Sequence, residues 1–268
     1  MGHASVSFGR DNVTRFIHLL ALLAVNAVPV AGWFVGGWSA GTTLVVYWFE
    51  TVAACVFVSA RIVAHRRMSP RRGHFSYLAP SSSRQRSKAS FLQGFLVTSL
   101  VFSAAHGLFL GVILFVLDNN GQGALAGVDW RSVKLGSLYV LVALAIDFVV
   151  DLPGLRHWSF WQIEQTANRS LGRIAVVHLT LVIGMFGAAM TDASALFGVF
   201  VVLKTLYSLS MALPQWEPAT APTWLSRTMN RIPSVHPGQR FEDAWAKDRA
   251  DEAERRERNE EPWSDARR

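Results

Sequence analysis

Residues 91–117 read FLQGFLVTSLVFSAAHGLFLGVILFVL and contain no Asp, Glu, Lys or Arg. A helix rises about 1.5 Å per residue, so roughly 20 mostly apolar residues cross a hydrocarbon core about 30 Å thick. This stretch is long enough to span a bilayer, and five others qualify. The predicted fold is all-α, a polytopic membrane protein whose six transmembrane helices cover about 15–37, 41–63, 91–117, 132–152, 171–190 and 193–213.

Two polar turns separate spans that would otherwise run together. The apolar segment 171–213 is too long for one crossing and divides at Met190-Thr191-Asp192-Ala193. The first two spans divide at Gly36-Gly37-Trp38-Ser39, a glycine-rich turn signal. Residues 1–213 therefore form a six-span domain, and residues 214–268 form a separate polar tail.

The composition agrees with this division. Of the 268 residues, 51% are hydrophobic and only 17% are charged, whereas soluble domains carry about 25% charged residues. The tail holds 10 of the 26 Lys and Arg and 11 of the 19 Asp and Glu. These numbers exclude a soluble enzyme and a disordered chain. The single cysteine, Cys55, excludes an intramolecular disulfide and a paired-cysteine zinc site.

Basic residues predict the orientation of the chain in the membrane. The connection Arg61–Lys88 carries eight Lys or Arg and no acidic residue, whereas the turns after the first and fifth spans carry none. Positively charged loops stay in the cytoplasm. We therefore expect a multi-pass protein of a prokaryotic plasma membrane with both termini in the cytoplasm.

Polar residues recur in the middle of the predicted spans. Charged side chains at this depth cost about 2.5–3.5 kcal/mol each and normally face the protein interior. Five spans bring such a group to similar depth, and helical spacing adds polar neighbours on the same faces. The central candidates are Glu50, His106, His178 and Lys204, and the supporting polar residues are Asn26, Tyr47, Asp147 and Arg173. We expect Lys204 to balance the charge of Glu50.

Several short blocks in the spans combine aromatic, glycine and ionisable residues. These are Tyr47-Trp48-Phe49-Glu50, His106-Gly107-Leu108-Phe109, Arg173-Ile174 followed by His178, and Lys204. Together they resemble the prokaryotic membrane family called domain of unknown function 6498, over about residues 15–210 and without the tail. The resemblance implies a helical membrane architecture and these candidate residues, but it implies no reaction.

The polar residues leave several functions open. A structural network would pair Glu50 with Lys204 and fix the register of the helices. Proton- or ion-linked transport would use Glu50, His106 and His178 as proton carriers. An intramembrane enzyme would use the same three residues as metal ligands, or the two histidines as haem ligands. A scaffold would act through its cytoplasmic tail. The sequence names no cofactor.

The polar segments outside the spans predict membrane and protein contacts. We expect the Arg61–Lys88 connection to lie against anionic lipid headgroups, and no motif supports nucleic-acid binding. The connection 153–170 is expected to lie flat at the membrane interface. In the tail, residues 241–260 are highly charged, which predicts a fraying helix or disorder in water. Docking of a cytoplasmic partner to this tail is the alternative.

Overall fold

The computed structural model describes residues 4–80, 90–188, 202–203, 205–207, 218–232, 238 and 240–264, and it describes their side chains except at 4–15, 19 and 176–188. All regular elements within these ranges are helices, as predicted. Their bounds are α1 Ala4–Phe34, α2 Ala40–Met68, α3 Arg72–Phe75, α4 Phe91–Asn119, α5 Gly123–Ala126, α6 Trp130–Asp151, η1 Leu155–His157, α7 Phe160–Ala188, α9 Thr223–Met229 and α10 Phe241–Glu260.

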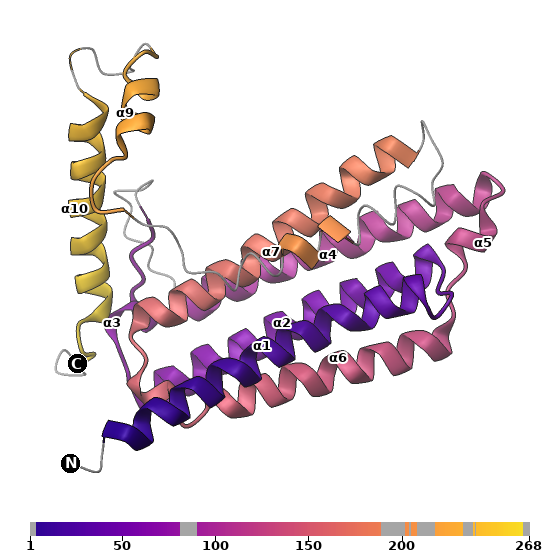
Figure 1. Cartoon of the computed structure of the whole chain (residues 1–268), viewed down its shortest axis with the longest axis horizontal. Helices are drawn as coiled ribbons and strands as arrows, with labels where there is room; N and C mark the ends of the chain where they lie inside the picture. Colours follow the sequence, from indigo (N-terminus) through magenta and orange to yellow (C-terminus); the bar gives the residue numbers. More distant parts are fainter. Residues whose placement is uncertain are drawn as a thin grey trace.

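The five long helices α1, α2, α4, α6 and α7 run side by side as a bundle (Figure 1). Helix α2 is central, since it packs against α1, α4, α6 and α7. In the described part of the chain, four stretches are long and apolar enough to cross a membrane: Phe16–Phe34, Ala40–Met68, Phe91–Asn119 and Gly123–Asp151. The chain is therefore a helical protein of the membrane type.

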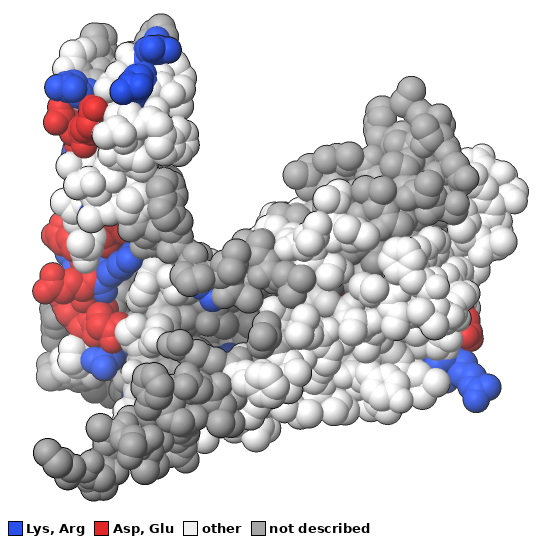
Figure 2. Space-filling view, viewed as in Figure 1, with Lys and Arg blue, Asp and Glu red and all other residues white. Residues whose placement is uncertain are grey.

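The surface of the bundle is that of a protein immersed in lipid. Large apolar side chains of α4, among them Leu100, Leu108 and Phe115, point outward and are exposed. Figure 2 shows charged side chains on the arm formed by α9 and α10 and at the opposite tip of the bundle, with an almost uncharged surface between them. Because lipid tails solvate apolar side chains and not charges, this distribution matches a bilayer around the long helices.

Local sequence signals explain where the helices begin. The side chains of Ser39, Ser90 and Asp129 accept hydrogen bonds from the first free N–H groups of α2, α4 and α6. Between α1 and α2, Gly37 adopts a positive φ of 63°, which glycine tolerates without strain. The glycine-rich turn thus separates the first two long helices, as the sequence predicted.

Some helix bounds differ from the predicted spans. Helix α2 continues to Met68, so that Arg66 and Arg67 belong to a helix and not to a connection. Helix α7 begins at Phe160, so that the second half of the expected interfacial connection 153–170 forms its first turns. Apart from five residues, the predicted span 193–213 lies outside the described residues.

The segment between α2 and α4 is fixed by two buried histidines. The Nδ1 atom of His65 lies 2.8 Å from Nε2 of His74, and Nε2 of His65 lies 2.9 Å from the carbonyl oxygen of Trp158. Burial lowers the pKa of His74 to about 3. This histidine therefore stays neutral at physiological pH and joins α3 to the end of α2.

Helix α10 runs across the ends of the long helices at the end of the bundle where α3 lies (Figure 1). It contacts α3, α7 and α9. The backbone of Arg72 donates to the carbonyl of Glu261, and the indole of Trp263 stacks on Phe75 at 4.5 Å. The C-terminal half of this helix is therefore anchored to the bundle. The sequence predicts a fraying helix or disorder for residues 241–260, whereas the structure shows a helix whose C-terminal half packs against the bundle.

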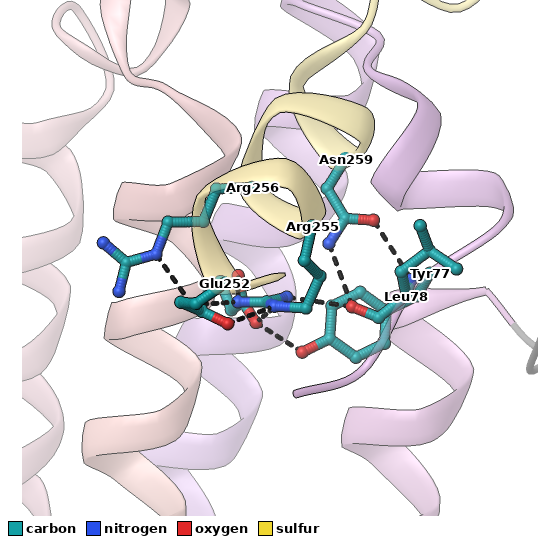
Figure 3. Close-up of polar contacts among 7 residues, drawn as sticks. Tyr77, Leu78, Glu252, Arg255, Arg256 and Asn259 are labelled. Atoms are coloured by element: carbon teal, nitrogen blue, oxygen red, sulfur yellow. Dashed lines mark hydrogen bonds and ion pairs between the residues drawn. The ribbon is translucent and has the colours of Figure 1, made fainter. Parts of the chain in front are cut away.

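A buried arginine explains why this half is anchored (Figure 3). The Arg255 guanidinium donates to Glu164 of α7 at 2.8 Å and to Glu252 of its own helix at 2.7 Å. The Tyr77 hydroxyl donates to Glu164 at 2.5 Å. We call Tyr77, Glu164, Glu252 and Arg255 the α10 arginine cluster. Arg256 also donates to Glu252 at 2.7 Å, so the two carboxylates contact two guanidinium groups and no buried carboxylate lacks a cation.

Further hydrogen bonds extend this anchor to the polypeptide backbone. The Asn259 side chain accepts from the Leu78 N–H and donates to the Leu78 carbonyl, both at 3.0 Å. The hydrogen bond from Arg255 lowers the pKa of Glu252 to about 2. Periodicity alone could not reveal this docking, because the partners lie about 90 to 180 residues apart along the chain.

Candidate intramembrane polar site

Two aspartates one turn apart on α6 meet residues from α1 and α2. Arg61 of α2 donates to Asp147 through Nη2 at 2.5 Å and to Asp151 through Nε at 2.7 Å. His18 of α1 places Nδ1 at 2.7 Å from Asp147 and Nε2 at 3.1 Å from Asp151. We call these four residues the intramembrane arginine cluster. Each carboxylate is thus shared by an arginine and a histidine.

The geometry around His18 suits a protonated imidazole. A neutral imidazole carries one N–H donor and one acceptor nitrogen, whereas an imidazolium carries two donors. Because a carboxylate oxygen lies close to each nitrogen of His18, only the imidazolium satisfies both. In that form the two positive and two negative charges of the cluster cancel. Loss of the proton leaves one excess negative charge.

The cluster has a buried side and a more open side. The side chains of Arg61 and Asp151 are each only 6% exposed, whereas those of His18 and Asp147 are 33% and 26% exposed. Asp151 is the last residue of α6, and Arg61 lies two turns before the end of α2. The cluster therefore sits near the end of the bundle that carries α3 and α10, where water is closest.

The same donors have the spacing of a metal site. His18, Asp147 and Asp151 each offer a ligand atom within 4.8 Å of the others, and His and carboxylate ligands suit several transition metals. However, the Arg61 guanidinium already binds both carboxylates and would repel a cation at this point. The donor set therefore fits a proton better than a metal ion.

A second charged pair lies deeper in the bundle. Arg173 of α7 donates to Glu50 of α2 at 3.2 Å, and both Glu50 and the neighbouring Tyr47 are buried. The sequence named Arg173 as a supporting residue but expected Lys204 to balance Glu50. Arg173 balances it in the described part of the chain, and Lys204 lies outside that part.

The polar face predicted in α4 points into the protein. Ser99, Ser103 and His106 are all buried. The Trp48 indole of α2 donates to the carbonyl of Ser103 at 3.0 Å and packs over Gly107, where a Cβ atom would lie 3.0 Å from Nε1. Gly107 thus permits this close approach of α2 and α4.

The structure brings together only part of the predicted site. Glu50, Tyr47 and Arg173 meet, and His106 and Asn26 are buried as expected. Asn26 donates to the carbonyl of Leu22 on its own helix. The side chain of His178 lies outside the described residues. Asp147 belongs to a different cluster from Glu50.

Sequence reasoning missed the pairing of Arg61 with Asp147 and Asp151. Arg61 opens a run of basic residues, so its charge was assigned to the cytoplasmic connection. The available signal was the spacing: Asp147 and Asp151 recur on one face of their helix, as do His18 and Asn26. An acidic stripe inside the membrane requires cations nearby, and Arg61 is the nearest basic residue on the neighbouring central helix.

The two charged groups are arranged in series along α2. Glu50 and Arg61 are eleven residues apart, which is close to three full turns and about 16 Å of helix rise. Both therefore lie on nearly the same face of α2, one turned to α7 and the other to α6 and α1. A rearrangement of α2 would affect both ion pairs.

The apolar helices mark the chain as a helical protein of the membrane type. Comparison with known families makes the assignment more specific: the chain belongs to DUF6498, a family of unknown function, whose model matches residues 12–223. This range contains both charged groups and excludes α10. No curated protein and no solved structure matches the chain.

Proposed function

We propose that this chain is a six-span protein of a prokaryotic plasma membrane that binds and releases protons as part of transport. The four apolar stretches, the α7 backbone and the apolar sequence 193–213 support six spans. The basic Arg61–Lys88 connection and the even number of spans support termini in the cytoplasm.

The observation that carries the proposal is the position of His18 between two carboxylates. Histidine is the side chain that ordinarily changes charge near neutral pH. When His18 loses its proton, the intramembrane arginine cluster acquires a net negative charge at the contact of α1, α2 and α6. This change of charge would alter the relative stability of two arrangements of the helices, which a proton-linked transporter requires.

In this proposal, the Glu50–Arg173 ion pair is the site at which a transported solute or ion would bind. It links the same α2 helix to α7, deeper in the bundle. Buried ionisable residues in spanning helices mark substrate and ion pathways. A solute or ion that competes for Glu50 or Arg173 would release α7 from α2, while His18 binds the proton about three turns further along α2.

A purely structural role is the second candidate, and the balanced charges favour it. With His18 protonated, every charged group of the intramembrane arginine cluster has a partner. Such a network also fixes helix register without chemistry. A metal- or haem-dependent enzyme has less support, because Arg61 already binds both carboxylates of the metal-like grouping among the described residues.

Lipid and protein contacts of the polar segments complete the proposal. In the Arg61–Lys88 connection, Arg67 is exposed, and Arg84, Arg86 and Lys88 lie outside the described residues. The exposed Arg67 is available for anionic headgroups. The exposed charged face of α10 is available to a cytoplasmic partner.

A pH-jump experiment separates transport from a structural role without knowledge of the solute. Proteoliposomes on a sensor surface are exposed to a rapid change of pH, and displaced charge is recorded. The wild type should give a transient current that His18→Gln abolishes. The matched control is Asp118→Asn, which neutralises an exposed aspartate at the far end of α4 and should preserve the current. If wild type and His18→Gln give the same signal as empty liposomes, the structural role holds.

A further inference from the structure

The segment around α9 combines basic and apolar side chains on the outside of the protein. Between Glu217 and Glu242 the chain contains Arg227, Arg231 and Arg240 and no acidic residue. Trp224 is 63% exposed and Ile232 is 56% exposed. Tryptophan at the headgroup level and arginine beside lipid phosphates are the usual features of a segment that lies on an anionic membrane surface.

One asparagine holds this segment against α10. The Asn230 side-chain oxygen accepts a hydrogen bond from the Phe241 N–H at 2.8 Å, and its amide nitrogen donates to both Glu242 oxygens at 3.1 and 3.3 Å. The first N–H groups of a helix have no partner within the helix. Asn230 supplies a partner to one of them, so α9 is attached to the start of α10.

The placement of α10 turns α9 toward the membrane. The C-terminal half of α10 is bound to α7, and α10 crosses the ends of the long helices (Figure 1). Its N-terminal half extends beyond the bundle, and α9 stands on the side of α10 turned toward the long helices. Since the long helices cross the bilayer, a helix across their ends runs along the membrane surface. Helix α9 then lies between α10 and the lipid.

Most of the described basic residues in the Arg61–Lys88 connection are engaged with protein. Arg61 binds two aspartates, Arg66 stacks on Phe75, and Arg72 pairs with Glu261. By contrast, Arg227 and Arg231 are exposed. We propose that α9 is a lipid-binding segment, in which Trp224 and Ile232 enter the headgroup region and Arg227 and Arg231 bind the phosphates of anionic lipids. This inference requires only that the bundle crosses a bilayer, and it is independent of proton movement.

A fluorescent probe on α9 tests the contact in the full-length protein. In a Cys55→Ser background, Thr228→Cys places an environment-sensitive dye one turn from Trp224. Ala246→Cys is the matched control, since it lies on the face of α10 opposite the docked Arg255. Both proteins are placed in nanodiscs of phosphatidylcholine alone or mixed equally with phosphatidylglycerol. The dye at position 228 should shift to the blue and resist a soluble quencher only with phosphatidylglycerol, and the dye at position 246 should not respond.

Charge variants test the arginines. The quenching data give the ratio of membrane-shielded to quencher-accessible dye at position 228. Arg227→Gln should reduce this ratio by about fivefold, which corresponds to ~1 kcal/mol per basic residue at an anionic surface. Lys247→Gln on α10 is the matched control and should leave the ratio unchanged. Equal quenching at both positions in both lipids would overturn the proposal. Shielding at position 228 that persists in detergent would also overturn it, because protein would then cover α9.

Discussion

The intramembrane arginine cluster and the α10 arginine cluster are built in the same way but differ in one partner. In each, an arginine binds two carboxylates: Arg61 binds Asp147 and Asp151, and Arg255 binds Glu164 and Glu252. The third partner is a histidine in the first cluster and a tyrosine in the second. A histidine changes charge near neutral pH, and a tyrosine does not. Under the proposed function, the histidine gives the first cluster a charge that can change, whereas the second cluster is a permanent anchor.

Removal of the arginine inside the membrane should have the largest effect. Arg61→Ala leaves His18 as the one remaining cation that Asp147 and Asp151 share within the cluster, and removal of one partner of a buried pair costs about 3–5 kcal/mol. We expect a large fall in the thermal unfolding temperature in detergent, or loss of folded protein. Arg67→Ala, at an exposed position on the same helix, should change stability by less than about 0.5 kcal/mol. Equal stability of the two variants would contradict a paired, buried Arg61.

Removal of Arg255 should destabilise the docking of α10 without unfolding the bundle. Arg255→Ala leaves Glu164 buried with only Tyr77 as a partner, at a cost of about 3 kcal/mol. Because this pair joins α10 to the bundle, the loss should appear as faster hydrogen exchange and proteolysis within 241–260, while the bundle unfolds at its normal temperature. The control is Arg258→Ala, whose ion pair with Glu254 is solvent-exposed and contributes less than about 1 kcal/mol. Global unfolding of Arg255→Ala would show that the bundle depends on α10.

Tyr77 should contribute less than Arg255 to the free energy that docks α10 on the bundle. Tyr77→Phe removes the hydrogen bond to Glu164 but leaves its ion pair with Arg255, so we expect a loss of about 1–2 kcal/mol in docking free energy. Hydrogen exchange of α10 measures this loss. Tyr139→Phe, on the exposed surface of α6, should leave the exchange of α10 unchanged. If Tyr77→Phe released α10 as fully as Arg255→Ala, the arginine would not be the main anchor.

The anchor should be nearly insensitive to pH in the physiological range. The pKa of Glu252 falls from 4.5 to about 2, chiefly through its hydrogen bond with Arg255. A lowered carboxyl pKa gives stability that is fully present above the unfolded value and is lost as the pH falls toward the folded value. Docking should therefore persist from neutral pH to about 5 and weaken only in stronger acid. Hydrogen exchange of α10 as a function of pH, corrected for intrinsic rates, measures this. Undocking between pH 8 and roughly 6 would contradict a permanent anchor.

The sequence predicted the positions of the helices far better than the side-chain contacts between them. Apolar length and cap residues such as Ser39 and Ser90 determine where helices can form, and these signals are local. Glu50, Tyr47 and Arg173 were identified because a buried charge needs an internal partner wherever it lies. The roles of Arg61 and Arg255 could not be predicted in this way. Each lies in a charged stretch typical of a solvated segment, and only the three-dimensional packing shows that its carboxylate partners are buried.

The protonation state of His18 is the most direct test of the account. Nitrogen NMR of histidine-labelled protein in lipid, with the His18 signals assigned from their absence in His18→Gln, distinguishes an imidazolium from a neutral ring. We expect an imidazolium at mildly acidic pH that loses its proton over the same pH range in which the wild type displaces charge, with no such loss in the buried His74. A His18 ring that stays in one protonation state across the range of the charge displacement would contradict it.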